Sequence, residues 1–215
     1  MTIDIDEAKV RRSGPTLWLA WTLATAAGML LGFVPFALLS ADLDLLLVRI
    51  LLPLWAGFLV GLFQWLVLRP YLTHAADWLL NGGAGWALGF ALGLLLIESL
   101  RGNPLGALLG YLLFGLSIGV MQWPVLRREI PNALAWIAAS IIGWASGAYL
   151  SQAVLTGLVT NDEASLLLRT AVSAGVTGLA AGAITGLALV WIVRQPELEG
   201  ARGRPAATAN REPGP

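Results

Sequence analysis

The chain has 215 residues, of which 57% are hydrophobic and 12% are charged, and its formal net charge is zero. Soluble globular domains carry about 25% charged residues, so this composition excludes an ordinary soluble domain. The absence of cysteine excludes disulfides, thiolate metal ligands and cysteine nucleophiles, and the zero net charge gives no basis for binding nucleic acid.

The N-terminal segment 1–15 is acidic before it is basic, and the apolar run after it is longer than that of a signal peptide. We therefore expect a cytoplasmic tail there and not a cleaved signal. Six apolar segments follow, each near the length of about 20 residues that a membrane-spanning helix needs. The expected helices cover 16–40, 44–69, 79–99, 104–127, 132–158 and 165–194. The last segment, 195–215, is rich in Pro, Gly, Ala and charge, which predicts a disordered cytoplasmic tail.

Basic residues predict the orientation of these helices. One side carries Lys9, Arg11, Arg12, Arg69, Arg127, Arg128, Arg194, Arg202, Arg204 and Arg211, and the other side carries Arg49, Arg101 and Arg169. This positive-inside bias predicts that both termini lie in the cytoplasm. The outer side also holds acidic residues, namely Asp42, Asp44, Glu98, Asp162 and Glu163. We interpret them as local neutralisation of the outer arginines, with an outer cation site as the alternative.

A repeated stretch divides the six helices into three units. GLFQWLVLR at 61–69 recurs as GVMQWPVLR at 119–127. The first helix joins the pattern through Trp21, Gly28 and Gly32, and the sixth joins it more weakly through Thr185. The sequence therefore predicts an all-α membrane protein of three tandem helical hairpins, which cover 16–69, 74–127 and 132–194. A pseudo-threefold packing of the hairpins about the membrane normal is our hypothesis, and an open row of hairpins would contradict it.

Glycines recur on one face of each repeated helix. Residues at i, i+4, i+7 and i+11 form a narrow stripe on a helix, and small residues there let two helix backbones approach closely in a membrane. The predicted packing positions are Gly57, Gly61, Gly85, Gly89, Gly115, Gly119, Gly143, Gly147, Gly178 and Gly182.

The same stripe carries Gln64, Gln122 and Thr185, so these side chains should face a neighbouring helix and not the acyl chains. Gln64 precedes Arg69 by five residues, about 7 Å along a helix, which places it in the inner leaflet. Two interpretations stay open. The polar groups are interhelical hydrogen bonds worth about 1 kcal/mol each, or they form, with Trp65 and Trp123, the polar floor of an inner-leaflet cavity for a lipid headgroup, quinone or small substrate.

Tryptophan gathers at the same predicted depth. We expect an interfacial aromatic belt at the cytoplasmic side, formed by Trp18, Trp21, Trp65, Trp78, Trp123, Trp136 and Trp191.

Catalytic and metal sites lack support in the sequence. His74 is the only histidine and lies in a loop, and Glu98 and Arg101 have the spacing of an ion pair at a helix end. No ionisable residue lies deep in a predicted span, which argues against a proton-coupled pump. Ser140, Ser151 and Ser173 have no base near them in sequence. We therefore predict no catalytic residue, no metal and no cofactor.

The motif GxxxGxxQWxVLR is followed by a short loop and W-x6-GWAxG. With this motif the chain resembles uncharacterised bacterial multi-pass membrane proteins in which the same motif is repeated. The resemblance covers about 57–147 and implies helical hairpin repeats without a catalytic residue, in a bacterial inner membrane. We predict a non-enzymatic scaffold or accessory subunit of a larger membrane complex, whose partners are the lipid bilayer and other subunits or a second copy. The alternative is a binding protein or transporter with an inner-leaflet site, and an enzyme acting on lipids has the least support.

Overall fold

A computed structural model describes residues 14–39, 45–158 and 166–202, and these ranges contain six α-helices. Each helix contains a segment long and apolar enough to cross a membrane, so the chain is a polytopic all-α membrane protein, as predicted. The helices are α1 (Gly14–Leu39), α2 (Leu45–Leu68), α3 (Asp77–Ser99), α4 (Pro104–Leu126), α5 (Ala135–Leu158) and α6 (Leu166–Arg202).

Five of the six helices begin and end within a few residues of the predicted boundaries, and α6 differs at its C-terminal end. It continues to Arg202, so 195–202 is helical where a disordered tail was expected. Extending an existing helix needs no new nucleation, which offsets the low helix propensity of Pro196 and Gly200 in this segment. The N-terminal tail up to residue 13, the C-terminal residues 203–215, and the outer acidic residues Asp42, Asp44, Asp162 and Glu163 lie outside the described residues.

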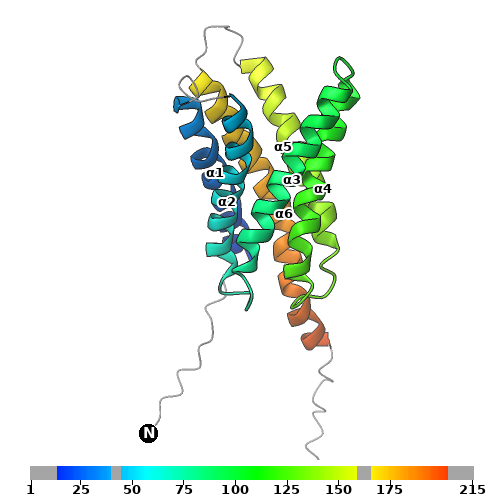
Figure 1. Ribbon diagram of the computed structural model, residues 1–215. Helices are drawn as coiled ribbons and strands as arrows, with labels where there is room; N and C mark the ends of the chain where they lie inside the picture. The colour runs from blue at the N-terminus through cyan, green and yellow to red at the C-terminus, as the bar shows by residue number, and fades with distance from the viewer. Residues whose placement is uncertain (1–13, 40–44, 159–165, 203–215) are drawn as a thin grey trace, which may run out of the picture.

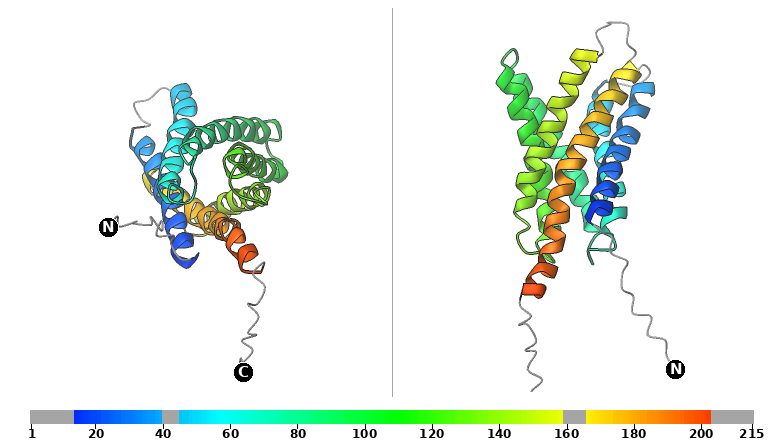
Figure 2. Two further views of the ribbon diagram at one scale, coloured as in Figure 1. Left: turned by 90° about the horizontal axis from the view of Figure 1, so that it is seen from below. Right: turned by 180° about the vertical axis from the view of Figure 1, so that it is seen from behind.

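The six helices form a closed ring. Each helix packs against its neighbours in sequence, and α6 packs against α1 to complete the circle (Figure 1, Figure 2). Within the described residues, no pair of helices makes a backbone contact across the ring. The start of α1 and the end of α6 lie at the same end of the bundle (Figure 1). We name this the inner end, following the predicted orientation, and the opposite end the outer end.

Glycines of the odd-numbered helices set the packing inside each hairpin. A Cβ atom added at Gly28 would lie 2.6 Å from Val60 Cα of α2, and one added at Gly85 would lie 2.9 Å from Ile118 Cα of α4. Real Cβ contacts are essentially never shorter than 3.0 Å, so any larger residue would push the paired helices apart.

Glycines of the even-numbered helices instead face the next hairpin. A Cβ atom at Gly115 would lie 2.7 Å from the carbonyl oxygen of Ser140 in α5, and one at Gly178 would lie 2.7 Å from Ala26 Cα in α1. The contact at Gly178 is the one that closes the ring. The contacts of Gly28 with Val60 and of Gly85 with Ile118 lie at equivalent positions of the first two hairpins, and the pseudo-threefold packing stays a prediction. Most other predicted packing glycines approach a neighbouring helix within 3.3 Å in the same way: Gly57, Gly89, Gly119, Gly143, Gly147 and Gly182.

Candidate functional site

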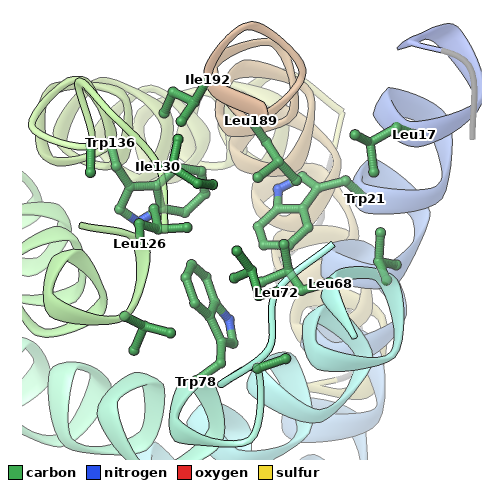
Figure 3. Packing of buried hydrophobic residues seen from close by; sticks show 14 of the residues in the cluster. Leu17, Trp21, Leu68, Leu72, Trp78, Leu126, Ile130, Trp136, Leu189 and Ile192 are labelled. Carbon is green, nitrogen blue, oxygen red and sulfur yellow. The ribbon is translucent and has the colours of Figure 1, made fainter. Parts of the chain in front are cut away.

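Three tryptophans, one from each hairpin, meet at the centre of the inner half of the ring. Figure 3 shows Trp21, Trp78 and Trp136 pointing toward one another among leucine and isoleucine side chains. Their ring centroids lie 5.9, 5.6 and 5.5 Å apart, and every pair has edge-to-face geometry. This arrangement is the one that the aromatic quadrupole favours. We call these three residues the inner tryptophan cluster.

The inner tryptophan cluster corrects the prediction of an interfacial belt. Trp21, Trp78 and Trp136 are at most 1% exposed and belong to the protein core. The prediction used only their depth along the helix, whereas burial also depends on the helix face, and these three face into the ring. Trp191, by contrast, is 51% exposed and lies on the outside of the bundle.

Each indole of the cluster donates a hydrogen bond to the predicted polar residue of a neighbouring even-numbered helix. These acceptors are at most 3% exposed, as expected for side chains that face another helix. The bonds are Trp78 Nε1 to Gln64 Oε1 at 3.1 Å, Trp136 Nε1 to Gln122 Oε1 at 3.0 Å and Trp21 Nε1 to Thr185 Oγ1 at 2.9 Å. The three polar residues therefore join adjacent helices, which is the structural interpretation of their position.

The three polar residues do not make equivalent sets of hydrogen bonds. Gln64 Nε2 also donates to Thr25 Oγ1 of α1 at 3.1 Å. In the second repeat the residue at the Thr25 position is Gly82, which has no side chain to accept a hydrogen bond. Gln122 Nε2 lies 3.5 Å from the point that a Cβ atom of residue 82 would occupy. In the third repeat it is Ser140, whose buried Oγ has no hydrogen-bond partner among the described residues. The amide of Gln64 thus bridges two helices, while that of Gln122 holds one.

A second aromatic layer lies toward the outer end. The rings of Trp86, Trp144 and Phe114 contact one another edge to face, with centroids 5.0 to 5.7 Å apart. Met29, at the α1 position equivalent to Trp86, belongs to the same buried cluster. This layer separates the inner tryptophan cluster from the space beyond it.

A cavity of about 430 Å³ lies above this layer in the outer half of the ring, and we call it the outer cavity. Its floor is the second aromatic layer, and α3 contributes an apolar wall of Phe90, Leu94 and Ile97. Thr177 near the floor and Arg169 at the outer end of α6 are eight residues apart, which gives a depth of about 12 Å. Helices α5 and α6 contribute a polar wall, formed by Ser151, Gln152, Arg169, Thr170, Ser173 and Thr177.

Hydroxyl groups on the polar wall already bond to one another or to the backbone. Ser151 Oγ donates to the carbonyl oxygen of Ala148 at 2.8 Å, and Ser173 Oγ donates to Ser151 Oγ at 3.4 Å. Their oxygens retain lone pairs that can accept from a ligand. Arg169 is the only charged residue that lines the outer cavity within the described chain. It also takes part in an interaction inside the protein.

None of the residues predicted to bind a ligand lines the outer cavity. Gln64, Gln122 and Thr185 are engaged around the inner tryptophan cluster, while Trp65 and Trp123 pack against its periphery. The Arg127 guanidinium carbon lies 4.5 Å from the centroid of the Trp123 ring, a cation–π contact.

The outer cavity went unpredicted because its residues carry no motif. The signal in the sequence was the i, i+3, i+7 spacing of Thr170, Ser173 and Thr177, which sets three hydroxyls on one face of an apolar helix.

The carboxylate of Glu129 connects the loop between α4 and α5 to the loop between α2 and α3 at the inner end. Glu129 accepts hydrogen bonds from the backbone N–H groups of Thr73, at 2.8 and 2.9 Å, and His74, at 3.0 Å, and its Oε1 lies 3.2 Å from His74 Nδ1. Partial burial raises the pKa of Glu129, but these hydrogen bonds outweigh it and hold the pKa below its ordinary value. Arg128 also pairs with Asp77 at 2.5 Å. The exposed loop position of His74 and the ion pair between Glu98 and Arg101 are as predicted.

Acidic residues and His74 do not gather into a group of three or more that would hold a metal ion, within the described ranges. Comparison of the chain with models of protein families, with curated proteins and with solved structures found no match. The functional argument therefore rests on the geometry of the outer cavity.

Proposed function

We propose that the protein is a non-enzymatic membrane protein that binds a small, largely apolar molecule in the outer cavity. The supporting observation is the combination of an aromatic floor, an apolar wall and a polar wall around about 430 Å³. Ligand pockets measure about 300–1,000 Å³ and combine mostly apolar lining with a few polar groups. This proposal moves the binding site from the inner leaflet to the outer half of the ring.

The inner half of the ring favours binding over conduction. Two stacked aromatic layers fill the space between the outer cavity and the inner end. The hydrogen bonds of Gln64, Gln122 and Thr185 hold the lower layer in place. A ligand that enters from the outer side or from the bilayer therefore meets a closed floor, and passage through the ring requires both layers to separate.

The lining of the outer cavity favours binding over catalysis. General acid–base chemistry uses His, Asp, Glu, Lys, Tyr or Cys within hydrogen-bond reach of the substrate. Tyr111 is the only such residue that lines the cavity within the described chain, so no pair of acid and base side chains faces a ligand there.

An accessory subunit of a membrane complex is the second candidate. It is supported by the tight interior, in which glycines bring backbones together and leave the lipid-facing surface for a partner. Exposed aromatic side chains such as Trp191 and Tyr149 lie on that surface. Native electrophoresis in mild detergent should then show a large assembly, whereas the binding protein migrates alone or as a small oligomer.

A cavity-filling substitution tests the proposed function. Ala148 lines the outer cavity, so Ala148→Phe should fill it, while Ala153→Phe places the same ring on an exposed position of α5. Native mass spectrometry of protein extracted from membranes should show a bound small molecule in the wild type and in Ala153→Phe, and none in Ala148→Phe. Equal retention by all three proteins, or retention by none, would contradict the proposal.

A further inference from the structure

We infer that the outer cavity takes an anionic amphiphile with a single apolar chain, whose carboxylate or phosphate head lies at Arg169 and whose chain lies on the aromatic floor. This inference rests on the proposed function and adds the chemical class of the ligand. It uses three features of the outer cavity, which are the charge of its lining, its depth and the separation of its walls.

The charge of the lining selects the sign of the head. Arg169 is the only charged residue around the outer cavity in the part of the chain that the structure describes. Among the described lining residues a cationic head would find no counter-charge for the hydration that it loses, which is costly in an apolar site. A guanidinium has five N–H donors in a planar fork that matches carboxylate and phosphate oxygens. Because there are five donors, the interaction that Arg169 makes within the protein is compatible with a bound anion.

The depth of the outer cavity limits the chain. The distance from Arg169 to Thr177 along α6 is about 12 Å. One leaflet of a bilayer is about 15 Å thick, half of a hydrocarbon core of about 30 Å. A full-length acyl chain is thus longer than the cavity, and a medium-length chain fits. The volume of about 430 Å³ is at the lower end of the range of ligand pockets, which favours one chain over two.

The two walls orient the ligand. Polar groups of α5 and α6 extend from the rim toward the floor, and Phe90, Leu94 and Ile97 of α3 lie on another side. A chain bound against α3 keeps its head at the rim, beside Arg169 and Thr170. Oxygens of that head accept from Arg169, and a hydroxyl or phosphoryl group near the head also bonds to the polar wall.

Two sources supply this chemistry, a free medium-chain carboxylate and a monoacyl phospholipid. We would incubate the purified protein with an equimolar mixture of decanoate, decanol and decylamine, and separately with decyl phosphate as the phosphate-headed probe. Native mass spectrometry then measures the fraction of protein that retains each probe. Preference for decyl phosphate over decanoate indicates a lipid headgroup, and the reverse preference indicates a free carboxylate. Either preference supports an anionic head.

The wild type should retain decanoate above decanol and decanol above decylamine. Arg169→Gln should lower the preference for decanoate over decanol about tenfold, the loss of one charge-assisted hydrogen bond. Arg101→Gln is the matched control, because Arg101 is another outer arginine, 78% exposed and outside the cavity. Detergent takes up each probe equally in all samples, so the change in the ratio between variants reports the arginine alone.

The inference is overturned if the wild type retains decylamine to the same extent as decanoate. It is also overturned if Arg169→Gln leaves the preference for decanoate over decanol unchanged. The order of the three probes in the wild type decides the matter even if Arg169→Gln does not fold, and Arg169→Lys should keep a preference for the anion. If all three probes bind equally and Ala148→Phe abolishes their binding, the proposed function holds and the anionic ligand is wrong. If no probe binds the wild type, both fail.

Discussion

The different hydrogen bonding of Gln64 and Gln122 around the inner tryptophan cluster predicts different losses of stability when each is replaced by leucine. Leucine has nearly the volume of glutamine but no hydrogen-bonding groups. Gln122→Leu therefore leaves the buried indole N–H of Trp136 without its acceptor at 3.0 Å. An unsatisfied buried donor costs about 1–3 kcal/mol, and interhelical bonds in membranes average about 0.6 kcal/mol with a maximum near 1.7. We expect Gln122→Leu to lower the free energy of unfolding by about 1–2 kcal/mol.

Gln64→Leu should cost more, because Gln64 also donates to Thr25 Oγ1 at 3.1 Å, and Gln122 has no such partner beside Gly82. The extra bond adds about 0.6 kcal/mol, close to a threefold change in the unfolding equilibrium. The two substitutions are chemically identical at equivalent positions and serve as controls for each other.

The assay is unfolding in mixed micelles of rising dodecyl sulfate fraction, followed by circular dichroism. Removing the donor as well should lower the cost, so Gln122→Leu in a Trp136→Phe background should be less destabilising than in the wild type. If Gln122→Leu costs as much as Gln64→Leu, the bond from Gln64 to Thr25 contributes nothing. If neither substitution changes the midpoint, the hydrogen bonds to Trp78 and Trp136 do not stabilise the ring.

Two further predictions concern the closure of the ring and the inner loops. Gly178→Ala should destabilise the protein by about 1–3 kcal/mol, since its Cβ would lie 2.7 Å from Ala26 Cα; Gly83→Ala, with nothing within 4 Å of the added atom, should be tolerated. Equal midpoints for the two variants would argue against α6 packing on α1. The pKa of Glu129 is lowered in the folded state, so its contribution is complete above the ordinary pKa of glutamic acid and is lost as the pH falls through the lowered value. Glu129→Gln should therefore lower the melting temperature at pH 7 and make no difference in acid, and a constant difference at all pH values would contradict this.

The sequence was sufficient for the helices and for the burial of the polar residues against a neighbouring helix. Long apolar spans specify membrane helices because the backbone has no other way to satisfy its hydrogen bonds in lipid. The burial of Gln64 and Gln122 followed from their place on a glycine stripe, since a polar amide on that face must meet another helix. The difference in hydrogen bonding between the three repeats also has a basis in the sequence, because the equivalent positions hold Thr25, Gly82 and Ser140.

The depth of a residue along a helix was not enough to place the tryptophans or the cavity. Trp21 and Trp191 lie at a similar depth, yet Trp21 is buried and Trp191 is 51% exposed. Trp21 lies on the face of α1 that points into the ring, and Trp191 lies on the outward face of α6. The outer cavity depends on which hairpins face one another across the ring. Phe90 in α3 and Ser173 in α6 line the same space although no sequence spacing relates them.

The proposed function requires an outer cavity that is reached from the outer side and an inner half that is closed. The chain has no cysteine, so single cysteines report access without a background. We would treat intact cells with a membrane-impermeant thiol reagent after Ser173→Cys, in the outer cavity, and after Ser140→Cys, which is fully buried in the inner half. The account predicts modification at 173 that decanoate slows, and none at 140. Modification at 140, or no modification at 173, would contradict it.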